Sequence, residues 1–120
     1  MADSRDKRRL PRVSARWPVT IVTEKGEVNG ETRNITVEGL FLHTLERLRE
    51  GEVYRMTIKL PEKPVEVAGR LQWSNVDHFK PDHEIPGMGF CFVKIAAEDR
   101  ERLGDAIAAH EDKAQPGPKK

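Results

Sequence analysis

The sequence predicts an all-β domain with one C-terminal helix, arranged as a six-stranded antiparallel β-barrel. Two segments on either side of residues 61–64 alternate between apolar and polar side chains, a period typical of half-buried strands. A later segment, residues 88–95, is almost continuously apolar, and helix formers follow it. Because closure removes exposed strand edges, six strands in a chain of 120 residues favour one small closed barrel.

Turn signals separate the strands along the chain. Lys25-Gly26 follows a run that is rich in Val, Ile and Thr. Gly39 ends the tripeptide Val37-Glu38-Gly39, a tight turn in which the glycine permits a positive φ or a close approach by another group. We expect the second strand to bend near Asn29-Gly30. The six predicted strands are residues 17–23, 27–36, 40–44, 54–60, 65–73 and 88–95.

Aromatic and apolar strand residues are assigned to the core. Trp17, Phe41 and Trp73 fall on strand patterns and are predicted to pack there, with Trp73 also able to line the edge of a site. Residues 88–95 fit a strand that is buried on both faces or covered by a helix. Cys91 within it is expected to be a small core residue, and a single cysteine excludes an internal disulfide framework and a multi-cysteine zinc site.

Residues 96–110 are predicted to form the helix. Glu98 and Asp99 lie in its first turn, where the helix dipole favours negative charge. Leu103 and Ile107 share one apolar face with Ala96. Gly104 in the interior costs about 1 kcal/mol relative to alanine, so the helix depends on packing against the barrel. The charged, Pro/Gly-rich segment 111–120 is predicted to be a disordered tail.

The small net charge of +1 conceals an uneven distribution. Residues 1–16 carry six basic and two acidic side chains, a charge of +4, and the rest of the chain carries −3. A basic arm on a mildly acidic body suits a compact anionic ligand better than a long nucleic acid, which normally binds a broad basic face. Nucleic-acid binding is therefore disfavoured.

Several other functional classes lack support in the sequence. No apolar run approaches the length of a membrane span and the start MADSRDKRR has no apolar core of a signal peptide, so we expect a cytoplasmic protein without membrane insertion. Ser14 and Ser74 lie in no nucleophile elbow or paired His/Asp pattern. His78 and His83 lie near carboxylates, but without a recognised ligand spacing a hydrophilic loop is favoured over a metal site. We expect no enzyme activity, no cofactor and no metal.

Two short motifs carry the candidate chemistry. Arg8 and Arg12 lie just before the first strand, and guanidinium groups pair with phosphate or with guanine O6/N7 and stack on purines. Asn34 and Thr36 are two residues apart on a strand, which places an amide and a hydroxyl on one face. Gly39 then lets the backbone approach a flat ligand. Together these groups suit a guanine nucleotide.

The register of the arginine motif requires a choice. The pairs Arg5/Arg9 and Arg12/Arg16 have the same spacing as Arg8/Arg12. We prefer Arg8/Arg12 because Pro11-Arg12-Val13 leads directly into the strand.

The two motifs in this order resemble the PilZ domain, a bacterial receptor family for the second messenger cyclic di-GMP, whose patterns are RxxxR and (D/N)xSxxG. The stretches RRLPRVSARWPVTI, NITVEGLFL, GRLQW and GMGFCFVKI are also similar to PilZ sequence. The resemblance implies a PilZ-type six-stranded barrel over residues 8–110, a flexible basic arm over residues 1–7, and no catalysis. It also implies these cyclic di-GMP-binding residues: Arg8, Arg9, Arg12, Asn34, Thr36 and Gly39.

The first hypothesis for function is a regulatory module in which cyclic di-GMP closes the basic arm onto the barrel. The changed surface would be read by an unidentified protein partner that governs motility, adhesion or biofilm polysaccharide. The alternative is a degenerate PilZ-fold interaction module that does not bind the ligand. Thr36 stands where the family usually has serine, and Glu38 adds a carboxylate beside the site, which keeps this alternative open.

Overall fold

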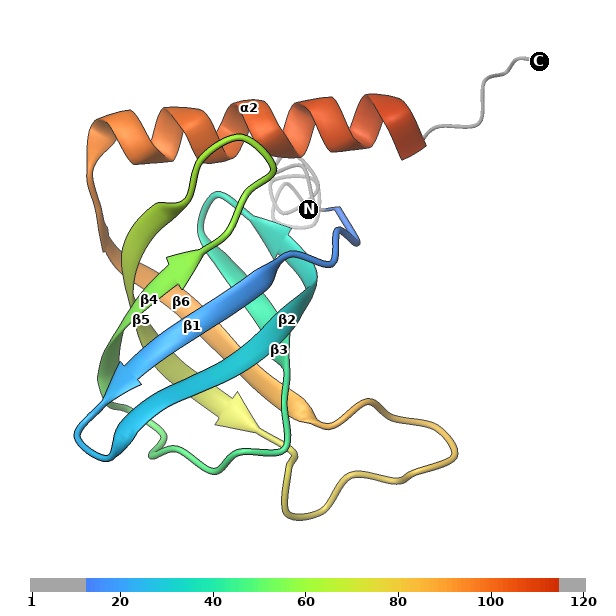
Figure 1. Ribbon diagram of the computed structural model, residues 1–120. Coiled ribbons are helices and arrows are strands. Elements are labelled where there is room, and N and C mark those ends of the chain that lie inside the picture. The colour runs from blue at the N-terminus through green and yellow to red at the C-terminus, as the bar shows by residue number, and fades with distance from the viewer. Residues whose placement is uncertain (1–12, 115–120) are drawn as a thin grey trace, which may run out of the picture.

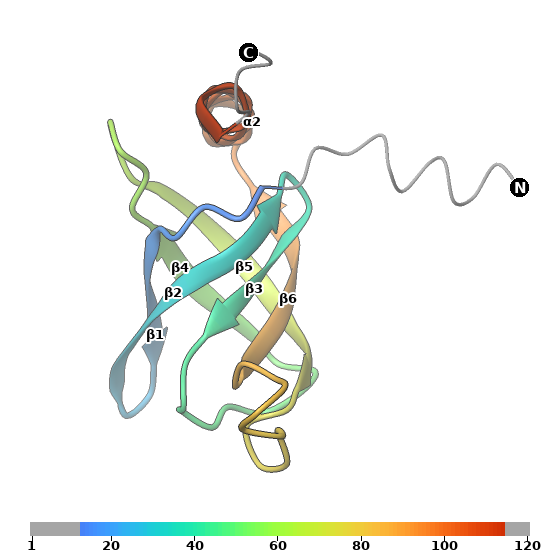
Figure 2. The ribbon, with the colours of Figure 1, turned by 90° about the vertical axis from the view of Figure 1, so that its right-hand side faces the viewer.

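The predicted fold class is confirmed by the computed structural model, which describes residues 13–114 and the side chains of residues 13–110. Six antiparallel strands form a closed barrel in the order β1-β2-β3-β6-β5-β4. One helix lies across an end of this barrel (Figures 1 and 2). The elements are β1 (Pro18–Thr23), β2 (Gly26–Thr36), β3 (Gly39–His43), β4 (Val53–Ile58), β5 (Val65–Ser74), β6 (Gly87–Ile95) and α2 (Ala97–Ala114).

The strand bounds agree with the predicted ranges to within two residues at each end. The helix instead extends to Ala114, four residues beyond its predicted end and into the segment predicted as a disordered tail. The predictions for residues 1–7 and 115–120 lie outside the described residues. No helix in the described part of the chain is long and apolar enough to cross a membrane.

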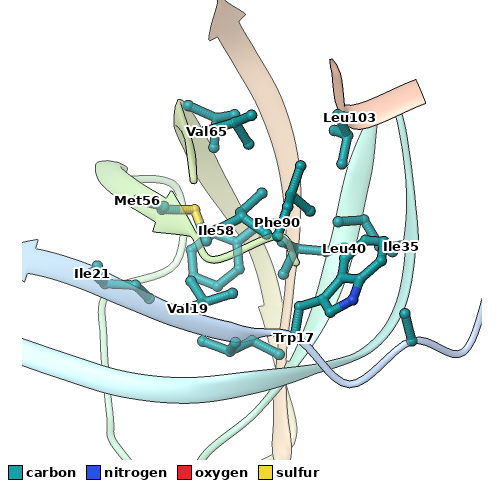
Figure 3. Close-up of a cluster of buried hydrophobic side chains, with 14 of the residues drawn as sticks. Trp17, Val19, Ile21, Ile35, Leu40, Met56, Ile58, Val65, Phe90 and Leu103 are labelled. Carbon is teal, nitrogen blue, oxygen red and sulfur yellow. The ribbon is translucent and has the colours of Figure 1, made fainter. Parts of the chain in front are cut away.

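The core fills the inside of the barrel and continues under the helix. Alternate residues of each strand point inward, as Val19 and Ile21 do on β1, and both are buried. Leu103 and Ile107 of α2 are also buried and belong to the same cluster (Figure 3 shows Leu103 near the end of the barrel). The prediction of the apolar helix face is therefore correct for Leu103 and Ile107, which close the barrel end, whereas Ala96 precedes α2 and is exposed.

Trp73 does not lie in the core, contrary to the prediction. The pairing of β5 with β6 shifts between Leu71 and Trp73, so Gln72 is the extra residue of a β-bulge. A bulge reverses the alternation of inward and outward side chains. Leu71 is fully buried, whereas Trp73 is 48% exposed.

The prediction for the sixth strand is correct for its first half only. Met88 and Phe90 are buried, but Cys91 and Val93 are exposed. The reason is that β6 belongs to a single-layered barrel in which α2 packs against β5 and β2, so the outward side chains of β6 face solvent. Cys91 is therefore a surface residue and not a core residue.

The first turn of α2 is attached to the barrel through Asp99. Its Oδ2 accepts a hydrogen bond from the Glu66 N–H (3.2 Å), and its Oδ1 pairs with the Arg102 guanidinium. The Arg102 hydrogen bond, together with that from the Glu66 backbone, lowers the pKa of Asp99 below its ordinary value, against a smaller opposing effect of burial. The carboxylate thus stays ionised and links helix to sheet.

Gly104 can be replaced by alanine without a clash. An added Cβ would lie 3.7 Å from Val37 Cγ1, an ordinary van der Waals separation. We therefore expect Gly104→Ala to raise the free energy of unfolding by about 0.5–1 kcal/mol, since alanine has the higher helix propensity. Chemical denaturation measures the change, and a loss of stability would show that the helix tolerates no added atom there.

Candidate functional site

A β-bulge in β2 shapes the outer wall of the barrel at the second motif. Thr32 pairs with Leu42 and Asn34 pairs with Phe41, so Arg33 is the extra residue. The irregularity is thus at Arg33 and not at the predicted bend near Gly30. Both Arg33 and Asn34 oppose Phe41 and share its outward face, because a bulge sets two residues against one. Thr32 is completely buried on the inner side.

Thr36 and the turn after it are held by several hydrogen bonds. The Glu38 N–H donates to Thr36 Oγ1 (2.9 Å), as in many short Ser/Thr turns. The Phe92 N–H donates to the Glu38 carbonyl (2.8 Å) and Arg100 Nη1 donates to the Val37 carbonyl (3.3 Å). The hydroxyl hydrogen of Thr36 remains to be donated elsewhere. The turn is therefore fixed from both β6 and α2.

Gly39 is required by the packing of two strands. Its φ is not positive, so of the two predicted reasons the close approach applies. The approaching group is protein backbone, since an added Cβ would lie 2.3 Å from the Phe90 carbonyl oxygen. The close contact between β3 and β6 therefore explains why a glycine is needed at position 39, and no ligand is required for the explanation.

Residues 13–17, here called the root segment, are attached to β2 beside the motif. Val13 and Ile35 exchange two backbone hydrogen bonds of 3.1 and 3.0 Å. Ile35 is the residue between Asn34 and Thr36. Because Val13 follows Arg12 directly, the chain that carries the predicted arginines joins the described body at the second motif. Arg8, Arg9 and Arg12 themselves lie outside the described residues.

Thr32 fastens the other end of the root segment. Its hydroxyl accepts a hydrogen bond from the Trp17 N–H (2.9 Å) and donates one to the Ala15 carbonyl, and its own N–H donates to the Trp17 carbonyl (2.9 Å). Thr32 is not among the site residues that the motifs predict. The available signal was a polar residue whose side chain falls on the inward face of a strand.

Phe41 and Trp73 form an aromatic pair on the same outer wall. Their rings are stacked with centroids 5.5 Å apart and an interplanar angle of 21°. Both residues pair with Gly89 of β6, and a Cβ at Gly89 would lie 2.5 Å from Trp73 Nε1, so the glycine makes room for the indole. The wall thus runs from Asn34 through Phe41 to Trp73, across four strands. Phe41 was predicted to lie in the core and is instead half-buried on this outer face.

The loop between β5 and β6 lies beside the aromatic pair. His78, Lys80 and His83 line an open hollow of about 530 Å³ together with Phe41 and Trp73. Asn75 organises this loop, since its side chain donates to the Ile85 carbonyl (3.2 Å) and accepts from the Gly87 N–H (2.9 Å). Within the described part of the chain, no group of three or more His, Cys, Asp or Glu side chains is arranged to hold a metal.

Comparison with known proteins identifies the family. The model of the PilZ domain matches residues 6–109. The chain belongs to the PilZ domain family. This confirms the resemblance drawn from the two motifs. No curated protein matches the chain in sequence.

Several solved structures share this fold at low sequence identity. The Bacillus subtilis inhibitor of motility (MotI/DgrA) is 23% identical with a TM-score of 0.77, over 91% of this chain and 53% of that one. Escherichia coli YcgR in complex with c-di-GMP is 15% identical with a TM-score of 0.74, over 90% and 47%. The chain thus spans about half the length of both proteins. The separate PilZ domain of YcgR with c-di-GMP is 17% identical with a TM-score of 0.68, over 90% and 94%.

Thr32→Val tests the attachment of the root segment. The substitution keeps the shape of the side chain but leaves the Trp17 N–H and the Ala15 carbonyl buried without the hydroxyl. We expect a loss of about 2–4 kcal/mol in the free energy of unfolding, measured by urea denaturation. The matched control is Thr20→Val, whose hydroxyl bonds Asn29 at the surface and whose loss should cost under about 1 kcal/mol. Equal stabilities of the two variants would contradict the assigned role.

Gly39→Ala tests the strand contact behind the motif. Since the added methyl would meet the Phe90 carbonyl, β3 and β6 must separate, and the free energy of unfolding should fall by about 1–3 kcal/mol. Gly104→Ala serves as the control, because the same chemical change there meets no obstacle. A Gly39→Ala variant as stable as the unaltered protein would show that the turn has room for a side chain.

Proposed function

We propose that this PilZ domain binds cyclic di-GMP on the outer wall described above, and that Arg8, Arg9 and Arg12 close over the ligand. The observation that carries the proposal is the bridge between Val13 and Ile35. This bridge joins Val13, which directly follows Arg12 in the sequence, to Ile35, the residue between Asn34 and Thr36. The c-di-GMP complexes of YcgR, which share the fold, support the choice of ligand.

Covalent geometry limits how far the arginines are from the wall. Arg12 is bonded to Val13, so their Cα atoms are about 3.8 Å apart. Arg8 is five residues before Val13, and five extended residues span at most about 18 Å. Arginine side chains from both positions can therefore converge on a ligand at Asn34.

The chemistry of the wall suits a guanine base. The Asn34 amide has a donor and an acceptor, and the Thr36 hydroxyl keeps a hydrogen to donate, so both can pair with a guanine edge. The Phe41–Trp73 pair offers an exposed π-face at the edge of the site, on which a base can stack. The two phosphates of the ligand then pair with the permanently charged guanidinium groups of the arginines. The proposed role is binding, without catalysis.

Ligand binding would be transmitted to the helix through two contacts. The Trp17 ring of the root segment meets the His110 ring of α2 edge-on, with centroids 5.9 Å apart. Arg100 of α2 bonds the Val37 carbonyl in the motif turn. Closing the arm would thus change a surface that includes α2, which an unidentified protein partner would read in the control of motility, adhesion or biofilm polysaccharide.

A second candidate function is an interaction module of the same fold that does not bind cyclic di-GMP. Two observations favour it. Thr36 Oγ1 is engaged by the Glu38 N–H, and Gly39 is explained by the Phe90 carbonyl, so both motif residues have a structural reason to be present.

Titration calorimetry with cyclic di-GMP separates the two candidates. The unaltered protein should bind saturably, and the double variant Arg8→Ala/Arg12→Ala should bind at least about 100-fold more weakly, since each charge-assisted hydrogen bond contributes about 1.5–3 kcal/mol. The matched control removes two charges elsewhere, at the exposed Arg49 and Arg55, and should bind normally. Absence of heat for the unaltered protein would contradict cyclic di-GMP binding and support the interaction module.

A further inference from the structure

Arg33 lies on the candidate wall although neither motif includes it. The bulge sets Arg33 and Asn34 together against Phe41, on the outward face of β2. Without the bulge, alternation would direct Arg33 and Asn34 to opposite faces. The irregularity therefore adds a guanidinium beside the amide that is proposed to hold guanine.

The residues on either side of Arg33 in β2 are hydrogen-bonded to the root segment. Thr32 is tied to Trp17 and Ile35 is tied to Val13, so Arg33 lies between the two attachments. The arginines of the first motif precede this segment directly. Arg33 thus lies on β2 beside the position proposed for the ligand.

The side chain of Arg33 lacks a full set of partners within the described part of the chain. Its Nε is shielded from solvent and has no hydrogen-bond partner there. A shielded donor without a partner is unfavourable, and a rotation of the side chain that brings the guanidinium to a ligand oxyanion would relieve that cost. A guanidinium is always charged and is more weakly hydrated than an ammonium, so the acceptor it favours is an oxyanion of planar, bidentate geometry.

We propose that Arg33 binds a phosphodiester oxyanion of the ligand from the barrel wall; this inference rests on the proposed function. The barrel wall itself then supplies a cation to the ligand. Asn34 hydrogen-bonds the base, while its neighbour Arg33 neutralises the phosphate. The wall thereby contributes its own part of the affinity for an anionic dinucleotide.

The test compares Arg33→Gln and Arg33→Lys with the unaltered protein by titration with cyclic di-GMP at low and at high salt. Glutamine keeps hydrogen-bond donors but removes the charge, so the dissociation constant should rise about tenfold or more, with a shallower dependence on salt. Lysine keeps the charge but lacks the planar, bidentate donor geometry of the guanidinium. It should therefore give an intermediate affinity with the normal salt dependence. Arg55→Gln, an exposed strand arginine on β4, is the matched control and should change neither quantity.

The outcomes distinguish this inference from the proposed function. If Arg33→Gln binds like the unaltered protein while Arg8→Ala/Arg12→Ala does not bind, the role of Arg33 is wrong and the proposed function stands. If the unaltered protein does not bind, both are wrong. An affinity loss with unchanged salt dependence and a lower free energy of unfolding would show a purely structural role, which also overturns the inference.

Discussion

The structure of the site depends on the attachment of the root segment to β2. Thr32 fixes one end of that segment through its buried hydroxyl, and the Val13–Ile35 bridge fixes the other. A buried hydroxyl that loses water must find partners inside the protein, and here both partners belong to the segment that follows the basic arm. This arrangement determines where the arginines enter, and hence which part of the barrel surface they can reach.

Two bulges give the outer wall its chemistry. A regular β2 would place only one of Arg33 and Asn34 outward, and a regular β5 would bury Trp73. Each bulge interrupts regular pairing at one residue and turns a side chain of the proposed site to the surface. The hydrogen bonds of the motif turn to α2 and β6 then make this wall rigid. For the proposed ligand, a preorganised wall would lower the entropy lost on binding.

The sequence was sufficient for the architecture, since period-two alternation, turn residues and helix formers are local signals. The same alternation misassigned Trp73, because the bulge at Gln72 that reverses it depends on pairing with β6. Cys91 was misassigned since a continuous apolar run does not show which side of a single-layered barrel is covered. The buried hydroxyl bonds of Thr32 and the outward position of Arg33 could not be predicted, because they depend on contacts between segments that are distant in the sequence.

Amide shifts in a nitrogen-15 NMR titration with cyclic di-GMP test the central claim most directly, because they report on every part of the barrel at once. If the ligand lies on the outer wall of β2 beside the root segment, the amides of Val13, Asn34, Thr36 and Gly39 shift together and saturate with one dissociation constant. Saturable shifts confined to the opposite end of the barrel, with these amides unchanged, would contradict it.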